Sequence, residues 1–316
     1  MVTTLGMGER VRINPKLLDW AIQRSGISYQ VLKAKFPLLD EWKTSDGRDP
    51  TFKQIEEFAR KTMTPFGYFF LSEPPIDRIS IPDFRTVGDI AIESPSPNLI
   101  ETLQDTERRQ KWMSDYRRDQ GFDRLKFGKS TQPNEKIKVT ANRIRERLRL
   151  KIEWARECKK WEDALGKLRE SIEDIGVLVS ITGIVGLNTH RKLDTEEFRG
   201  FAICDDYAPL IFVNGADAKS AQVFTIAHEL AHIWLGEEGI SNLIRMMPSK
   251  NEIEVKCNKI AAEFLLPEEQ FKKAWASSEH TKHPFINISR HFKVSPLVVA
   301  RRAHDLKKIK METFIK

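Results

Sequence analysis

The segment from Phe224 to Gly236 places the strongest constraint on how this chain folds. Most of its residues are apolar, so it predicts a helix that is buried on most sides. His228, Glu229 and His232 form the pattern H-E-x-x-H, and histidines four residues apart lie on the same helical face. This spacing lets both imidazoles bind one metal ion, with Glu229 as the base that activates water. The alternative is a surface helix with two ordinary histidines, but the flanking apolar residues argue against it.

A third metal ligand is expected further along the chain, because metal sites in hydrolases usually take three ligands from the protein. The segment 254–267 predicts a second amphipathic helix, in which Glu254 and Asn258 share one side. We predict that Glu254 is the third ligand and that Asn258 hydrogen-bonds a ligating histidine. Glu252 and Glu263 are the alternatives.

Cys257 lies one turn beyond Glu254 and is a possible fourth ligand. We expect a buried thiol instead, because a catalytic metal needs an open position. Two histidines and a carboxylate favour Zn²⁺, although Mn²⁺ or Fe²⁺ accept the same donors. His280 or His283 could stabilise an oxyanion, but the sequence does not place them.

Three short strands are predicted directly before the H-E-x-x-H helix, at residues 177–181, 198–203 and 210–214. They would form a small sheet beside the metal site. An edge strand of that sheet could pair with an extended peptide. We interpret Arg199 and Asn214 as structural residues rather than catalytic ones.

Residues 14–72 predict five short helices. The run of Leu32, Phe36, Leu39 and Trp42, followed by 47–59, resembles the helix-turn-helix domain of phage-repressor-like proteins. In such domains the third helix reads the major groove. Here that helix carries Asp40 and Glu41 rather than basic or amide side chains, which favours a degenerate domain that docks proteins. DNA binding is the alternative.

The second half of the chain resembles the ImmA/IrrE family of metallo-endopeptidases. The resemblance covers roughly residues 160–310 and rests on four segments: 198–201, 209–214, 224–232 and 254–267. It implies a zincin-like fold with His228, His232 and Glu254 on the metal and Glu229 as base. It also implies a specific protein substrate, since several family members cleave a helix-turn-helix repressor. Others resemble toxins that a helix-turn-helix antitoxin neutralises.

We therefore predict an α+β chain, mainly helical, with a zincin-like metallopeptidase core and helix-turn-helix-like flanking units. The core combines a small mixed or antiparallel sheet with the H-E-x-x-H helix. The predicted divisions are a helix-turn-helix-like domain, a connector with charged helices, the metallopeptidase core and a C-terminal helical unit that binds substrate or partner: 1–75, 76–160, 161–270 and 271–316.

The composition of the chain limits its expected cellular location. No apolar run approaches the length of a membrane span, and the first residues lack the apolar region of a signal peptide. Three cysteines fit neither a disulfide framework nor a C-x-x-C metal site, so we expect a reduced, cytoplasmic protein. The net charge of +7 permits contact with nucleic acid without requiring it.

The leading hypothesis is a narrow-specificity endopeptidase with zinc as cofactor. The alternatives are a metallopeptidase toxin of a toxin–antitoxin pair and a DNA-binding transcription regulator with a metal-sensing domain. The substrate, the activating signal and the oligomeric state do not follow from the sequence.

Overall fold

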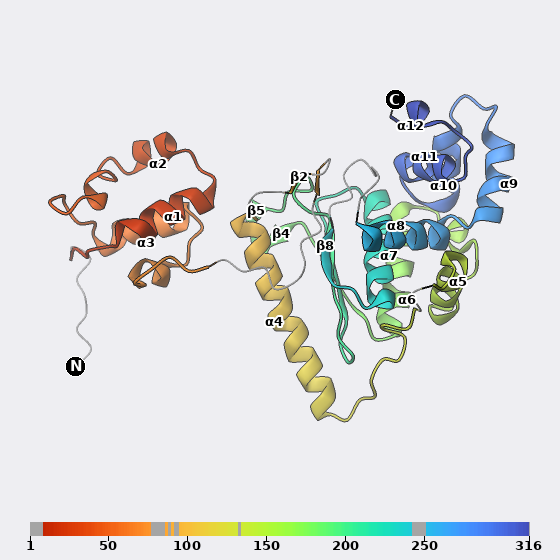
Figure 1. Cartoon of the computed structure of the whole chain (residues 1–316), viewed down its shortest axis with the longest axis horizontal. Coiled ribbons are helices and arrows are strands. Elements are labelled where there is room, and N and C mark those ends of the chain that lie inside the picture. The colour runs from red at the N-terminus through yellow and green to blue at the C-terminus, as the bar shows by residue number, and fades with distance from the viewer. Residues whose placement is uncertain are drawn as a thin grey trace. The chain divides into compact units, whose positions relative to one another are not determined.

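The computed structural model describes residues 9–76, 86–87, 90–91, 95–131, 134–241 and 251–315 (Figure 1). The chain divides into two compact units. Unit 1 comprises Met1–Arg78 and Ser94–Glu101, and unit 2 comprises Ile79–Glu93 and Thr102–Lys316. The four-part division expected from the sequence is finer than this and stays a prediction.

Unit 1 contains short helices around its own hydrophobic core. They are α1 (Pro15–Ser25), α2 (Tyr29–Lys35), η1 (Glu41–Lys43), α3 (Phe52–Lys61) and η2 (Phe66–Phe70). The side chain of Asn14 caps α1, and Thr51 and Gln54 form a reciprocal capping box at the start of α3. Trp42 and Phe58 pack edge to face in the core. Local caps therefore fix the starts of these helices, and one shared hydrophobic core holds them together.

The third helix expected in unit 1 is only one 3₁₀ turn, η1, with Trp42 buried at its centre. The segment between Pro37 and Gly47 is too short and too interrupted to propagate a helix. Asp40 forms an ion pair with Lys33 and accepts a hydrogen bond from Tyr29, so its carboxylate is engaged locally. The helix-turn-helix interpretation stays a prediction.

Unit 2 contains a four-stranded mixed sheet with the order β3-β7-β6-β8. The strands are β3 (Leu178–Thr182), β7 (Leu210–Asn214), β6 (Gly200–Ile203) and β8 (Gly239–Ser241). β3 pairs parallel with β7, and β6 pairs antiparallel with both β7 and β8. The three predicted strands are confirmed, and the sheet is mixed, as expected.

Two features of this sheet region were missed. β8 follows the H-E-x-x-H helix and is too short for its sequence to have a recognisable period. A hairpin of β4 (Ile184–Val185) and β5 (Asn188–Lys192) follows β3 and precedes β6 along the chain, and most of its residues are exposed. A further pair, β1 (Thr86–Val87) and β2 (Ile90–Ala91), is antiparallel.

The helices of unit 2 pack against the sheet and against one another. They are α4 (Pro97–Asp119, assigned to unit 2 from Thr102), α5 (Ile137–Arg147), η3 (Trp154–Glu157), α6 (Trp161–Asp174), α7 (Lys219–Leu235), α8 (Glu252–Leu265), α9 (Glu268–Ser278), α10 (Pro284–Phe292), α11 (Pro296–Asp305) and α12 (Met311–Ile315). The fold is α+β. No described helix combines the length and the apolar character that crossing a bilayer would require.

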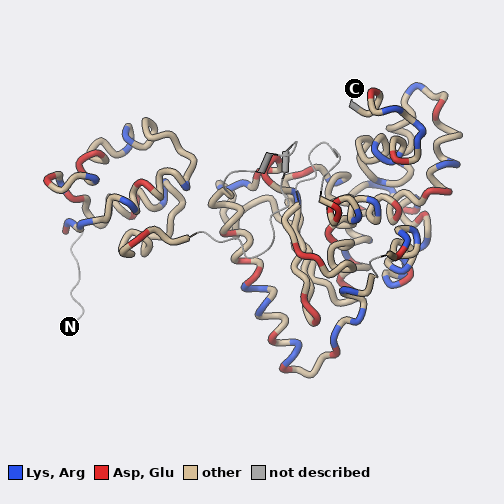
Figure 2. Tube along the Cα trace, in the orientation of Figure 1, with Lys and Arg blue, Asp and Glu red and all other residues tan. Residues whose placement is uncertain are grey.

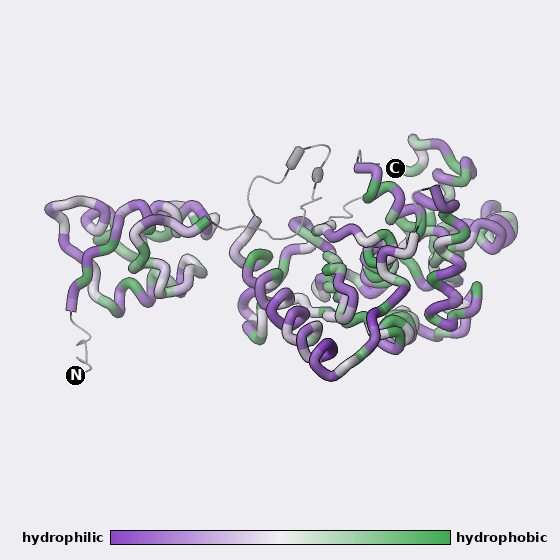
Figure 3. The backbone as a smooth tube through the Cα atoms, turned by 60° about the horizontal axis from the view of Figure 1, so that its bottom comes forward, coloured by the Kyte–Doolittle hydropathy of each residue, from purple (hydrophilic) through white to green (hydrophobic). Residues whose placement is uncertain are grey.

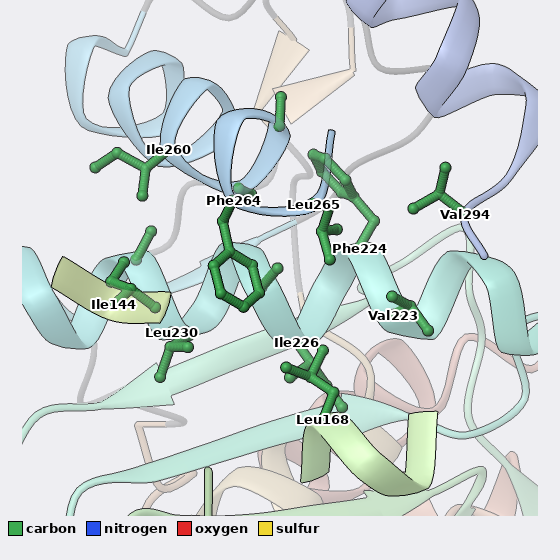
Figure 4. Close-up of a cluster of buried hydrophobic side chains, with 14 of the residues drawn as sticks. Ile144, Leu168, Val223, Phe224, Ile226, Leu230, Ile260, Phe264, Leu265 and Val294 are labelled. Atoms are coloured by element: carbon green, nitrogen blue, oxygen red, sulfur yellow. The ribbon is translucent and has the colours of Figure 1, made fainter. Parts of the chain in front are cut away.

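The main core lies around α7. Leu230 and Ile226 of α7 pack with Phe264 of α8 and Leu168 of α6 (Figure 4). The apolar side chains of α10 and α11 belong to the same buried cluster. In unit 2, the sheet residues Phe201 and Phe212 stack with ring centroids 4.7 Å apart. Because α7 lies in the middle of this packing, its polar residues must be satisfied inside the protein.

Charge is distributed unevenly over the helices. Acidic and basic residues alternate in groups along α4, whereas α2 and α5 carry mostly Lys and Arg (Figure 2). Hydrophobic and hydrophilic residues also alternate along these helices, as helices with one buried face require (Figure 3).

Candidate metal centre

Helix α7 carries the H-E-x-x-H residues, and both of its ends are anchored. At the N-terminal end, the amide of Gln222 donates to the carbonyl oxygens of Gly215 and Asp217. At the C-terminal end, Gly236 adopts φ +76°, and its N–H donates to the carbonyl oxygen of His232. A Cβ atom at residue 236 would lie 2.2 Å from Cγ of Lys129. Glycine is therefore required where the chain leaves the helix.

Helix α8 brings the third residue to the same place. Asn251 caps this helix by accepting hydrogen bonds from the backbone N–H groups of Ile253 and Glu254. The cap fixes the start of α8 and places Glu254 in its first turn, where the helix dipole favours a negative charge. α7 and α8 pack directly against each other.

His228, His232 and Glu254 form a compact and buried group of donor atoms. The two Nε2 atoms lie 3.1 Å apart. Oε2 of Glu254 lies 3.2 Å from Nε2 of His228, and Oε1 lies 3.0 Å from Nε2 of His232. Ligands about 2.0–2.1 Å from a tetrahedral ion would be separated by roughly 3.3 Å, so the spacing fits one metal ion.

The hydrogen-bond partners of the two Nδ1 atoms determine the tautomer of each imidazole, and so whether its Nε2 atom carries a proton or a lone pair. Nδ1 of His228 lies 3.1 Å from Oδ1 of Asn258, and Nδ1 of His232 lies 3.0 Å from the carbonyl oxygen of Glu237. Both partners are acceptors, so each Nδ1 carries the proton. In the neutral rings both Nε2 atoms then present lone pairs to each other and to a carboxylate. Three converging acceptors in a buried site are stable only with a cation between them.

Glu229 is fully buried beside this group. The hydroxyl group of Ser241 on β8 donates a hydrogen bond to Oε1 of Glu229. Oε2 has no hydrogen-bond partner among the described residues. Gly200 on β6 makes room for the carboxylate, because a Cβ there would lie 2.9 Å from Oε1. The sheet therefore holds one oxygen of Glu229 and leaves the other available.

Burial and neighbouring charges give the two carboxyl groups opposite properties. Burial raises the pKa of Glu229 to about 8, and Glu254 adds to this, while His232 and the hydrogen bond from Ser241 oppose it. Burial also acts to raise the pKa of Glu254. When the imidazoles of His228 and His232 are protonated at Nε2, their positive charges and hydrogen bonds outweigh burial and hold this pKa well below its usual range. Glu254 therefore favours its ionised form, and burial favours the protonated form of Glu229.

The alternative ligands lie elsewhere. Glu263 forms an ion pair with Arg302 and accepts a hydrogen bond from the N–H of Glu268. Glu252 is exposed at the start of α8. Cys257 is fully buried among apolar side chains, and burial raises the pKa of its thiol well above the ordinary value, which fits an inert packing residue. These three residues are outside the His-His-Glu group.

The other residues considered in the sequence lie outside the His-His-Glu group. His280 and His283 are exposed between α9 and α10. Arg199 pairs with Asp217 at 2.9 Å, and the buried amide of Asn214 donates to the carbonyl oxygen of Phe198. The contacts of Arg199 and Asn214 fit structural roles.

Sequence reasoning missed several residues that support the site. They are Gly200, Glu237, Ser241 and Asn251. Glu237 contributes a backbone carbonyl, which no side-chain pattern reveals. Asn251 stands three residues before the start of the predicted helix and directly before the observed α8, so N-cap preference could have found it.

A mixed sheet, an H-E-x-x-H helix and a buried His-His-Glu group together define a domain of the metallopeptidase type. Residues 173–304 match the family model Peptidase_M78, which describes the IrrE N-terminal-like domain. This stretch is therefore similar to the IrrE N-terminal-like domain, in agreement with the resemblance to the ImmA/IrrE family. The comparison with curated proteins gave no match.

Proposed function

We propose that the protein is a metal-dependent endopeptidase of narrow specificity that hydrolyses a peptide bond in a partner protein. The observation that carries the proposal is the convergence of three acceptor atoms from His228, His232 and Glu254 in a buried site. A metallopeptidase needs such a site and also a nearby base, and Glu229 supplies the base.

In this proposal His228, His232 and Glu254 hold Zn²⁺, and Asn258 and Glu237 fix the two imidazole rings by accepting their Nδ1 protons. A zinc ion held there would supply Lewis acidity, which polarises the scissile carbonyl group and lowers the pKa of water. Mn²⁺ and Fe²⁺ accept similar donors, so the metal is identified by elemental analysis of the purified protein.

The proton transfers fall to Glu229. Ser241 engages Oε1, so Oε2 is the atom that accepts a proton from the attacking water. The raised pKa makes the protonated form accessible, and Glu229 then passes the proton to the nitrogen of the leaving amine.

We propose a helix-turn-helix repressor as the first candidate substrate, on the strength of the family resemblance. The short η1 turn with its engaged Asp40 supports protein docking by unit 1 over direct base reading. Two experiments distinguish this function from the alternatives, a metallopeptidase toxin and a DNA-binding regulator. Growth arrest that depends on Glu229 would favour the toxin, and salt-dependent binding to one operator would favour the regulator.

The role of Glu229 is tested with Glu229→Gln. This variant keeps the size of the side chain but removes the proton acceptor, so cleavage of a repressor encoded by a neighbouring gene should fall by ~10²-fold or more. Metal content, measured by plasma mass spectrometry, should remain unchanged. Full activity in this variant would disprove the assignment of the base.

The metal ligand on α8 is tested with Glu254→Ala. Loss of one of three protein ligands should remove most of the bound metal after dialysis, as measured by the same elemental analysis. Glu252→Ala is the matched control, because Glu252 lies on the same helical turn but is exposed. Retention of metal in Glu254→Ala would show that another residue completes the site.

A further inference from the structure

Within unit 2, helix α4 directs polar residues toward the protein. Nε2 of Gln110 donates to the carbonyl oxygen of Ala208 at 3.1 Å, and the hydroxyl of Ser114 donates to Asp205 at 2.9 Å. Nη1 of Arg117 donates to the carbonyl oxygens of Gly176 and Tyr207, both at 2.7 Å. These bonds fix which face of α4 is turned inward.

The opposite face of α4 carries a pair of exposed aromatic residues. Trp112 is 64% exposed and Tyr116 is 46% exposed. Their rings stack nearly parallel, at 9°, with centroids 5.7 Å apart. Surface helices normally turn their aromatic residues inward, so α4 has the reverse arrangement. Tryptophan, tyrosine and arginine are the residues that dominate binding energy in protein interfaces.

Charged residues extend this face in both directions. Arg108 lies one turn before Trp112, and Asp119 lies almost one turn after Tyr116, so all four residues share one face at spacings of four, four and three. If two copies of α4 pack antiparallel through this exposed face, about a twofold axis at the level of residue 114, Trp112 of one copy faces Tyr116 of the other. Arg108 then faces Asp119. The face is therefore complementary to itself, which a symmetric dimer requires.

The basic residues of α4 do not favour a nucleic-acid partner. Asp105 pairs with Arg108 at 3.2 Å and with Arg109 at 2.8 Å, and Asp115 pairs with Lys111 at 2.9 Å. Positive and negative side chains alternate along the helix (Figure 2). A phosphate backbone would meet no net positive charge on this face.

We propose that the Trp112–Tyr116 face of α4 is a dimer interface, and that its occupant is the same face of a second copy of this chain. Stacking of the four aromatic rings supplies the buried apolar centre. The Arg108–Asp119 pairs at either end fix the antiparallel register.

The proposal is tested by sedimentation velocity on the full chain at concentrations from about 1 to about 100 μM. The native protein should show a reversible monomer–dimer equilibrium. The double variant Trp112→Ala/Tyr116→Ala should be monomeric over this range. Its circular dichroism and melting temperature should match those of the native protein, because both residues are exposed.

Charge exchange tests the register. Arg108→Glu and Asp119→Arg should each raise the dimer Kd at least about tenfold, since each sets like charges opposite one another. The two changes together should restore the native Kd. Lys111→Glu is the matched control, because it makes the same change of charge on α4 but lies to the side of the aromatic face, and it should leave the Kd unchanged.

Three outcomes would overturn the proposal. These are a monomeric native protein at all concentrations, a dimer that survives the double aromatic substitution, and single charge variants that the combination does not rescue. Binding of a labelled single-stranded oligonucleotide by a monomer, lost in the aromatic variant, would reassign the face to base stacking.

Discussion

The two oxygen atoms of Glu229 have different environments, and the difference decides how this residue can act. Oε1 accepts a hydrogen bond from Ser241, and Oε2 is buried without a hydrogen-bond partner among the described residues. A carboxylate free to rotate would offer either oxygen to water. Fixing one of them orients the other, which is how a positioned base gains efficiency.

We therefore expect Ser241→Ala to reduce catalysis without releasing metal. Hydrogen bonds to charged groups contribute about 1.5–3 kcal/mol, so kcat should fall by roughly ten- to a hundredfold. KM and metal content should remain close to native values, because Ser241 contacts the base rather than a ligand. Ser241→Thr keeps the hydroxyl and serves as the control. A change in KM alone would contradict this role.

Most of the candidate site could be predicted from the sequence at this scale. His228, Glu229 and His232 follow from one helical spacing, and Glu254 and Asn258 follow from the next helix. Ser241 could not be predicted, because its contact with Glu229 depends on how β8 pairs with β6. Contacts across a sheet leave no signal in local sequence.

At the scale of elements, the approach of α7 to the sheet depends on the absence of a side chain at Gly200. A Cβ there would lie 2.7 Å from Cγ2 of Thr225 and 2.9 Å from the carbonyl oxygen of Phe212. Neither neighbour can retreat easily, since one belongs to α7 and the other to the β7 backbone. Strand β6 and helix α7 can thus approach closely because residue 200 has no side chain.

Gly200→Ala should accordingly lower the free energy of unfolding by about 1–3 kcal/mol, as overpacking of a buried site typically does. Gly166→Ala is the matched control. Gly166 lies within α6 with no atom near its would-be Cβ, so alanine should stabilise the helix by about 0.5–1 kcal/mol. Urea unfolding measures both changes. Equal effects at the two positions would contradict the close contact.

The elements that could be predicted are those with a clear period or an unambiguous boundary. The α6 helix and the strands β3, β6 and β7 belong to this group. The third helix expected in unit 1 is present only as the 3₁₀ turn η1, because the apolar spacing of Leu38, Leu39 and Trp42 also suits a single turn that buries one tryptophan. In a segment this short, tertiary packing decides the backbone conformation.

At the scale of the whole molecule, the two units have separate hydrophobic cores. One buried cluster comes from α1 to η2 of unit 1, and the other surrounds α7 in unit 2. The described residues thus provide two centres of folding rather than one. The candidate metal group lies entirely in the second.

Calorimetry should consequently record two unfolding transitions for the metal-loaded protein. Removal of the metal with EDTA should lower the midpoint of one transition only, because a ligand stabilises the unit that binds it, by about 4 kcal/mol at a thousand times its Kd. The variant Glu254→Ala should reproduce the effect of EDTA without any chelator. Two midpoints that moved together would indicate that the units unfold as one.

The residues of the candidate metal site and their hydrogen-bond partners all lie between Gly200 and Asn258. This contiguous stretch encodes three strands of the sheet (β6, β7 and β8), the H-E-x-x-H helix and the first turns of α8. From outside, Arg145 and Arg302 bind the end of α8 by donating to backbone carbonyl oxygens. The groups that would hold a metal therefore come from one contiguous stretch, whereas the position of α8 also depends on two arginines outside that stretch.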